Sequence, residues 1–149
     1  MVGRRQFLKL AAAALLLVSG CATFRGGSDL DEYQEELRRL LDDLAGNYGE
    51  QVRLTSIARR IEIRSRELVA EHQEFVDTFN SLMSTRDVTE VQLRQSVDSY
   101  SHRRNWLRND LLQLQDELHN ELAPDEWAEV ITILNRTGQT VARSSVSGA

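Results

Sequence analysis

The sequence predicts an all-α fold, a long antiparallel helical hairpin with two shorter flanking helices. Two stretches, residues 54–85 and 88–122, repeat apolar side chains at alternating steps of four and three residues, which is the spacing of one helix face. No segment after residue 28 alternates apolar and polar residues as a half-buried strand does. The only proline, Pro124, lies beyond both stretches, so neither contains a strong helix breaker.

A single helical domain is expected over residues 29–141. Its first helix runs from about Asp29 to Ala45, and the apolar face carries Leu30, Leu37, Leu41, Leu44 and, past the helix, Tyr48. We expect Gly46 and Gly49 to end this helix, because glycine often follows the last helical turn.

The two long helices are expected to pair along continuous apolar seams. On the second helix, about Leu54 to Thr85, the seam is Leu54, Ala58, Ile61, Ser65, Leu68, His72, Phe75, Phe79 and Leu82. On the third helix, which ends near Leu122, the seam is Leu93, Val97, Tyr100, Arg104, Leu107, Leu111, Leu114 and Leu118. The turn between them lies within residues 84–89, where Asp87 and Glu90 have the spacing of a capping box. So short a turn predicts an antiparallel pair.

A fourth helix is expected to begin at Pro124, because proline fits the first helical turn, where its missing amide hydrogen costs little. The side chains expected to face the hairpin are Trp127, Ile131, Leu134 and Val141. Residues 142–149 are small and polar, so we expect this tail to fray.

The first twenty residues read as a signal peptide. Arg4, Arg5 and Lys9 precede a nine-residue apolar run, residues 10–18, and small residues follow it. A helix needs about 20 apolar residues to cross a bilayer, so this run is too short for a membrane span. Residues 1–20 are therefore expected to be removed.

The end of this segment, Val18, Ser19, Gly20 and Cys21, resembles the lipobox of bacterial lipoproteins. The resemblance implies that diacylglycerol modifies the Cys21 thiol and that the chain is cleaved before it. Cys21 is the only cysteine, so it has no intramolecular disulfide partner. Each buried methylene of the acyl chains contributes roughly 0.8 kcal/mol to membrane anchoring. Residues 21–28 are small and glycine-rich, as in a flexible tether.

The basic segment of the leader, Arg4, Arg5, Phe7, Leu8 and Lys9, resembles the twin-arginine export signal. That resemblance implies transport of a folded domain; the alternative is a general secretory signal with an arginine-rich start. Ala22 stands where an inner-membrane retention signal often places Asp. We therefore expect the lipid anchor to lie in the outer membrane of a Gram-negative host rather than in the inner membrane. The domain would then face the periplasm.

The charge of the mature chain argues against a nucleic-acid partner. Without Arg4, Arg5 and Lys9 it carries 15 basic and 23 acidic residues, a net charge of about −8. Binding to a phosphate backbone requires a basic surface.

Two short motifs flank the expected hairpin: Leu54-Thr55-Ser56-Ile57-Ala58 and Leu122-Ala123-Pro124-Asp125-Glu126. Together with the helix layout, they resemble the periplasmic Spy/CpxP chaperone-like and heavy-metal-sensor proteins, four-helix domains with two Leu-Thr-x-x-Gln motifs. Ala58 replaces the glutamine of the first motif, and Ala123 replaces the threonine of the second. The resemblance implies a protein-binding domain in the periplasm.

Metal binding does not follow from that resemblance, because Leu114 and Leu118 occupy the positions where the sensors carry His and Met. His102 and His119 lie about 25 Å apart along one helix, so they cannot share an ion. We expect His72 to face Tyr100 to His102 as a hydrogen-bonded seam histidine. The alternative is a metal site of His72 and His102 with Glu71 or Asp98 nearby. No metal or other cofactor is expected.

No catalytic motif is present, neither Gly-x-Ser-x-Gly nor a glycine-rich phosphate loop, so no enzyme is expected. Arg104 interrupts the third-helix seam, where it either fixes register or offers a basic spot to a client. Trp106 and Trp127 either pack between helices or lie exposed on the same client-binding surface.

These observations favour a membrane-anchored periplasmic lipoprotein that acts as a protein-interaction or chaperone-like envelope-stress module. Its expected partners are the membrane, through the lipid anchor, and other envelope proteins or unfolded clients. A homodimer through the hairpin is the expected assembly. Two alternatives stay open: a periplasmic metal-responsive sensor or buffer, and a structural or assembly lipoprotein with one dedicated partner.

Overall fold

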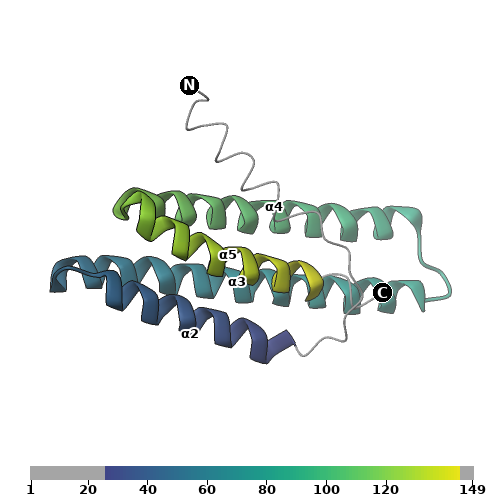
Figure 1. Ribbon diagram of the computed structural model, residues 1–149. Helices are drawn as coiled ribbons and strands as arrows, with labels where there is room; N and C mark the ends of the chain where they lie inside the picture. The colour runs from purple at the N-terminus through teal and green to yellow at the C-terminus, as the bar shows by residue number, and fades with distance from the viewer. Residues whose placement is uncertain (1–25, 145–149) are drawn as a thin grey trace, which may run out of the picture.

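The structure is a computed structural model, and residues 26–144 are described here. This part of the chain forms four helices (Figure 1). They are α2 (Gly26–Leu44), α3 (Tyr48–Met83), α4 (Glu90–Glu121) and α5 (Pro124–Ser144). No strand occurs between residues 26 and 144. The prediction of an all-α fold, a long hairpin with shorter flanking helices, is confirmed.

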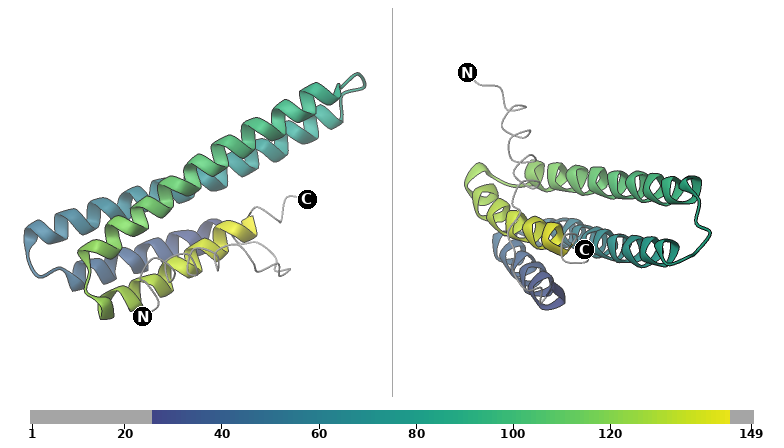
Figure 2. Two further views of the ribbon diagram at one scale, coloured as in Figure 1. Left: turned by 90° about the horizontal axis from the view of Figure 1, so that it is seen from above. Right: turned by 90° about the vertical axis from the view of Figure 1, so that its right-hand side faces the viewer.

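The helices lie in two layers of unequal length. Helices α3 and α4 form the hairpin layer, and α2 and α5 lie antiparallel to each other on one side of it (Figure 2). Helix α2 contacts both α3 and α5. Since α3 has 36 residues and α2 has 19, the shorter layer covers only part of the hairpin.

Ion pairs between helices show which residues of neighbouring helices lie side by side. Arg66 of α3 approaches Asp31 of α2 within 2.8 Å, and Arg60 approaches Glu117 of α4 within 2.7 Å. Such exposed pairs contribute at most about 1 kcal/mol each. Their value here is that they establish the register of the antiparallel helices.

The core lies at the end of the hairpin away from its turn, where all four helices meet. Its fully buried large side chains include Leu41 of α2, Leu54 of α3, Leu114 and Leu118 of α4, and Val130 of α5. Burial of each such side chain stabilises the fold by roughly 1.5–3 kcal/mol. The two short connections, residues 45–47 and 122–123, close this end.

Helix α3 begins six residues before the expected Leu54. Asn47 caps it, because its side-chain oxygen accepts a hydrogen bond of 3.0 Å from the Glu50 amide. Gly49 therefore lies in the first turn of α3 rather than in a break. Tyr48, expected on the apolar face of the first helix, is 81% exposed, so that expectation was wrong.

The capping box of α4 also differs from the expected one. The Thr89 hydroxyl accepts from the Gln92 amide at 3.3 Å, and the Gln92 side-chain oxygen accepts from the Thr89 amide at 2.9 Å. Asp87 lies in the turn and does not cap. Thr89 is preferred because it directly precedes the first helical residue, Glu90.

Helix α5 begins at Pro124 as predicted, and Trp127 and Ile131 of its expected face pack against the core although they are only partly buried. The buried residues are Val130, Ile133, Leu134, Thr137 and Thr140; of the four expected, only Leu134 is among them. The reason is that α5 packs on α2 as well as on the hairpin, which turns its inner face toward both. Helix α5 also extends past residue 141 to Ser144, into the tail expected to fray.

Candidate functional site

The apolar seam of α4 is buried over one half and open over the other. Leu107, Leu114 and Leu118 are completely buried, whereas Val97 is 41% exposed and Arg104 is exposed. These residues belong to one uninterrupted helix face. The difference arises because α2 and α5 are shorter than the hairpin and leave its turn end uncovered (Figure 2).

The seam of α3 changes in the same way. Ser65 is its last buried residue, and no residue of residues 66–106 is buried. We call residues 66–106 the distal hairpin; Figure 2 shows it extending beyond α2 and α5. The continuous pairing seam predicted from the sequence is therefore correct for the helix faces and wrong for the burial of its distal half.

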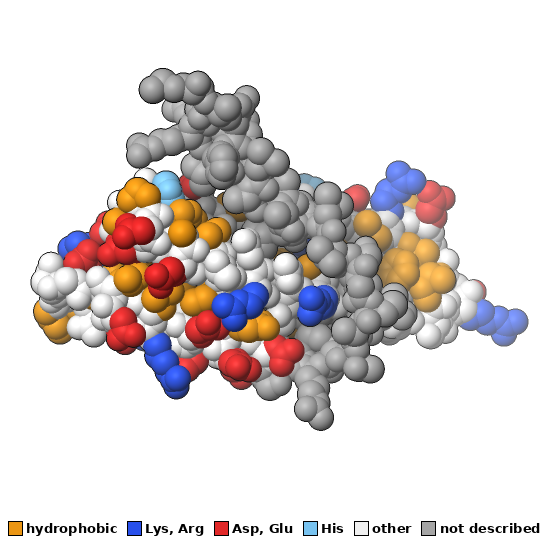
Figure 3. Space-filling view, viewed as in Figure 1, with side chains coloured by type: hydrophobic (Ala, Val, Ile, Leu, Met, Phe, Trp, Pro, Cys, Tyr) orange, Lys and Arg blue, Asp and Glu red, His pale blue; other side chains and the backbone are white. Residues whose placement is uncertain are grey.

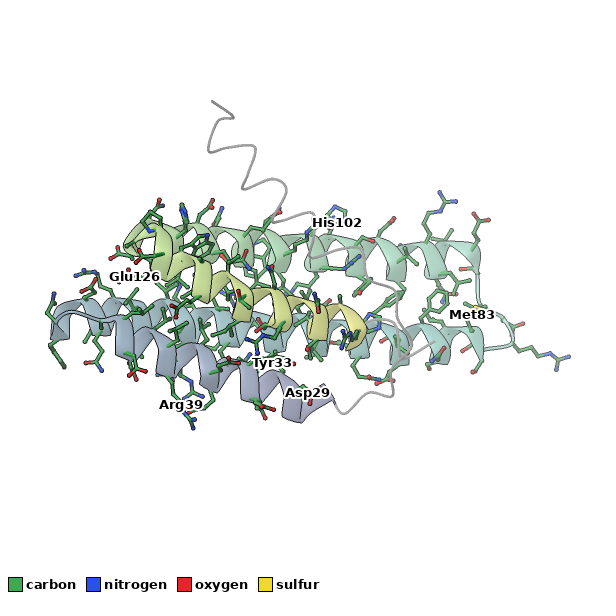
Figure 4. All side chains as sticks on the ribbon, in the orientation of Figure 1. Asp29, Tyr33, Arg39, Met83, His102 and Glu126 are labelled. Carbon is green, nitrogen blue, oxygen red and sulfur yellow. The ribbon has the colours of Figure 1, made fainter. Side chains whose placement is uncertain are left out.

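The uncovered side of the distal hairpin is the candidate site, named the open face. It consists of Val76, Phe79 and Met83 on α3 and of Leu93, Val97, Tyr100 and Arg104 on α4. In Figure 3 hydrophobic side chains gather near the turn of the hairpin, and Figure 4 places Met83 at that end of α3. Val76 and Met83 were not in the predicted seam. They neighbour its positions on the helical wheel, which is the signal that identifies them.

An aromatic cluster joins α3 and α4, and it includes Phe79 and Tyr100 of the open face. Phe75 stacks on Tyr100 with ring centroids 4.2 Å apart and planes at 12°, and Phe79 lies 5.5 Å from Phe75. The imidazole Nδ1 of His72 is 2.9 Å from the Tyr100 hydroxyl oxygen. Stacked rings hold their partners in fixed positions, so the open face rests on an ordered base.

His72 is the hydrogen-bonded seam histidine that the sequence predicts. Burial lowers its pKa below the ordinary value of 6.5, and the positive charge of Arg104 lowers it further. Burial raises the pKa of Tyr100. Both shifts favour the neutral forms, so the pair contributes no charge to the open face at neutral pH.

Arg104 is the one charged member of the open face. Its side chain is exposed, and among residues 26–144 it makes no ion pair. It lies at the end of the open face next to α2 and α5, one helical turn beyond Tyr100. Its guanidinium is therefore available to an acidic group of a partner.

The structure does not bring Arg104, Trp106 and Trp127 together. Trp106, which is 48% exposed, follows Arg104 by two positions and so projects from the other side of α4. There it lies between Arg64 and Arg103, whose guanidinium carbons are 5.0 and 4.8 Å from the ring centroid. Trp127 packs against the core, with the His119 ring 4.8 Å away.

A second surface feature is a groove of about 790 Å³ between α2 and α5, on the side away from the hairpin. Its carboxylates outnumber its guanidinium groups: Glu32, Glu35, Glu36, Asp43 and Glu129 against Arg39 and Arg136. Both arginines already pair, Arg39 with Glu35 and Arg136 with Glu36. The groove is therefore acidic.

The histidines do not converge on a metal site. His102 is exposed on α4, and its Nδ1 donates to the Asp98 carbonyl oxygen at 2.8 Å. Within residues 26–144, no three His, Cys, Asp or Glu side chains are placed to hold a metal ion. In the same part of the chain, no helix combines the length and apolar character needed to cross a bilayer.

The predictions about the leader concern residues that the structure leaves undescribed. The export signal from Arg4 to Lys9, the lipobox from Val18 to Gly20 and the lipidation site Cys21 all lie outside residues 26–144. The tether prediction, residues 21–28, overlaps the described part only from Gly26, where α2 begins.

The hairpin motifs behind the Spy/CpxP resemblance occupy unlike positions. Leu54 lies in the second turn of α3 rather than at its start, whereas Leu122 precedes α5 and Pro124 is the first residue of that helix. Comparison of the chain with known protein families, with curated proteins and with solved structures found no match in any of the three.

Proposed function

We propose that this chain is a membrane-anchored periplasmic lipoprotein whose open face binds apolar segments of other envelope proteins, as a chaperone-like, non-enzymatic module. The observation that supports it is the distal hairpin itself. The hairpin runs from a closed core into an uncovered surface on which Val97 and Met83 are exposed and Tyr100 and Phe79 are half-buried. Contiguous exposed apolar surface of this kind marks interaction sites in soluble domains.

The chemistry of the open face suits unfolded or amphipathic segments. Burial of its apolar area under a client contributes about 25 cal/mol per Å². Aromatic rings accept many side-chain shapes, and Met83 adapts its shape because its chain is unbranched. Arg104 at one end adds a charged hydrogen-bond donor for carbonyl or carboxylate groups of the bound segment.

The lipobox resemblance supports the same role. A lipid on Cys21 would hold the domain near the membrane, because only residues 22–25 separate the cysteine from α2. A domain confined there meets envelope proteins at a high effective concentration.

The test is suppression of aggregation of a reduced, unfolding client by the full-length protein in detergent. Val97→Glu places a charge in the open face and is expected to remove most of the protection. Val52→Glu is the matched control, because Val52 is also exposed, at 50% against 41% for Val97, but lies on α3 near the closed end. Protection by Val97→Glu equal to that of the wild type would contradict the proposal.

The same assay with and without zinc separates this role from a metal-responsive one. Protection that is unchanged by zinc is expected, because the open face contains no ligand cluster. Protection that appears only with zinc would favour the sensor or buffer.

The acidic groove between α2 and α5 supports a second candidate, an assembly lipoprotein with one dedicated basic partner. Glu32, Asp43 and Glu129 make no ion pair within the described part of the chain. Crosslinking from Thr132→Cys, in the groove, is expected to capture one partner under this candidate. Under the first candidate, the chaperone-like module, crosslinking from Val97→Cys is expected to capture several partners.

A further inference from the structure

We propose that the start of α2 and the end of α5, residues 26–33 and 138–144, act as a lid that opens locally and lengthens the open face. This inference rests on the proposed function, because it states what regulates the size of the client-binding surface. Its structural basis is a layer of buried polar side chains between the lid and the main core.

The buried polar residues of the described chain lie together in this layer, named the polar layer. Each is at most 6% exposed, and they come from α2, α3 and α5: Gln34, Ser65, Thr137 and Thr140. Gln34 and Ser65 share a level, because each lies between two residues that form ion pairs across α2 and α3: Asp31 with Arg66 at 2.8 Å and Arg38 with Glu62 at 3.9 Å. Thr137 joins them, because the residue before it pairs with α2: Arg136 approaches Glu36 within 3.2 Å.

Apolar burial is interrupted at the polar layer. The main core cluster ends one helical turn away from it, at Leu37, Ile61 and Leu134. Leu30 and Leu107 are also buried, at 5% and 0%, but they lie outside that cluster. The lid therefore packs through a separate and smaller set of apolar side chains, and it is able to open while the main core stays closed.

Gln34 makes the closed lid less stable. Its amide nitrogen and its oxygen are both buried without a hydrogen-bond partner among residues 26–144. The Thr137 hydroxyl does not donate to it, because that hydroxyl donates to the Ile133 carbonyl oxygen at 3.1 Å. The cost of an unpaired buried amide is recovered when the amide reaches water, so the polar layer favours opening.

Helix α5 has a weak point at the same level. Gly138 directly follows Thr137 within the helix. Glycine inside a helix leaves the unfolded backbone more freedom than any other residue, so it lowers the stability of the turn that contains it. Residues 138–144 therefore separate from the rest of α5 at the polar layer.

An open lid uncovers the part of the hairpin next to the open face. Leu68 on α3 and Leu107 on α4 occupy the seam positions that follow His72 and Arg104 toward the core. The ion pair of Asp31 with α3 places the lid beside this part of the hairpin. Opening therefore adds two leucines to the apolar surface, and Arg104 comes to lie within that surface instead of at its end.

Hydrogen exchange of the full-length protein in detergent tests whether the lid opens as a unit. The amides of Leu30 in α2 and Gln139 in α5 are expected to exchange at least about tenfold faster than that of Ile61. Gln34→Leu is expected to slow both about tenfold, because opening no longer releases an unpaired amide. The exposed Gln95→Leu is the control and should change neither.

Independent fraying of two helix ends predicts a different result. In that case Gln34→Leu, a substitution in α2, would leave the exchange of Gln139 in α5 unchanged. That result, or equal exchange of Leu30 and Ile61 in the wild type, would overturn the inference.

A crosslink tests whether opening serves client binding. Asp31→Cys with Arg66→Cys, joined by a short bismaleimide in the Cys21→Ala background, ties the lid to α3 so that only the introduced thiols react. The thioether links survive the reductant that unfolds the client. The crosslinked protein is expected to lose part of the client protection that the same variant shows before crosslinking.

The matched control joins α2 to α3 at the closed end. Asp42→Cys with Thr55→Cys suits it, because these side chains lie 3.4 Å apart and belong to neither the lid nor the open face. This crosslink is expected to leave client protection unchanged. Full protection by the protein crosslinked between residues 31 and 66 would overturn the inference.

The outcomes separate this inference from the proposed function. Coupled opening of the lid, with client protection that Val97→Glu leaves intact, would sink the proposed function alone. Client protection that Val97→Glu removes, in a protein whose lid amides exchange no faster than Ile61, would sink this inference alone.

Discussion

His72 of α3 and Tyr100 of α4 meet across the distal hairpin, with the imidazole Nδ1 2.9 Å from the phenolic oxygen. Phe75 stacks on Tyr100 from the α3 side. The other ring nitrogen, Nε2 of His72, is buried without a hydrogen-bond partner among the described residues. A protonated imidazole would place a charge in this apolar contact, close to Arg104.

This contact predicts a loss of stability in mild acid. Burial and Arg104 lower the pKa of folded His72 below 6.5, whereas the unfolded chain has the ordinary value. As the pH falls below about 6.5, the unfolded state therefore binds more protons than the folded state, and the free energy of unfolding decreases. The decrease ends once the pH has fallen below the pKa of folded His72. His72→Gln removes the effect.

Urea unfolding at about pH 7.5 and about pH 5 measures how the free energy of unfolding depends on pH in the wild type and in His72→Gln. The two proteins differ only at residue 72, so the difference between wild type and His72→Gln isolates the histidine. Equal pH dependence in the two proteins would show that His72 protonates freely in the folded state.

Replacement of Gln34 by Leu is expected to stabilise the fold. Gln34 is only 3% exposed, and neither its amide nitrogen nor its oxygen has a hydrogen-bond partner in the described chain. An unpaired buried polar group costs about 1–3 kcal/mol, so Gln34→Leu should raise the free energy of unfolding by about 1 kcal/mol or more. The exposed Gln95→Leu should change it by less than about 0.5 kcal/mol. Destabilisation by Gln34→Leu would reveal a partner for the amide.

Two leucines of the α4 seam are expected to differ in their contribution. Leu114→Ala empties a fully buried position and should destabilise by about 2–5 kcal/mol. Leu93 is only half-buried on the open face, so Leu93→Ala should cost about 1 kcal/mol. Thermal unfolding measures the stability of the two variants. A low protein concentration is used so that self-association does not contribute to the result. Equal losses would mean that something covers Leu93 in the monomer.

Replacement of both Arg4 and Arg5 by lysine is expected to block export if the leader is a twin-arginine signal, because that pathway requires the arginine pair. Fractionation of cells producing the variant measures the periplasmic pool. Normal processing of the variant would assign the leader to the general secretory route.

Cys21→Ala is expected to abolish lipid attachment and to release the domain from membranes. Metabolic labelling with palmitate and flotation of membranes measure the two effects. Ser19→Ala keeps a small residue at the processing site and is the control. Membrane association that survives Cys21→Ala would require another anchor.

The sequence by itself determined the helices, the hairpin and the His72–Tyr100 pairing, because these follow from local periodicity and from the length of one short turn. It misplaced the start of α3, since Asn47 caps the helix earlier than Gly49 ends the preceding one. It identified the seam of α4 without showing that Leu114 is buried and Val97 is open. Only the tertiary structure decided that, because coverage depends on where α2 and α5 end relative to the hairpin. The same long-range packing turned Val130 rather than Ile131 fully inward.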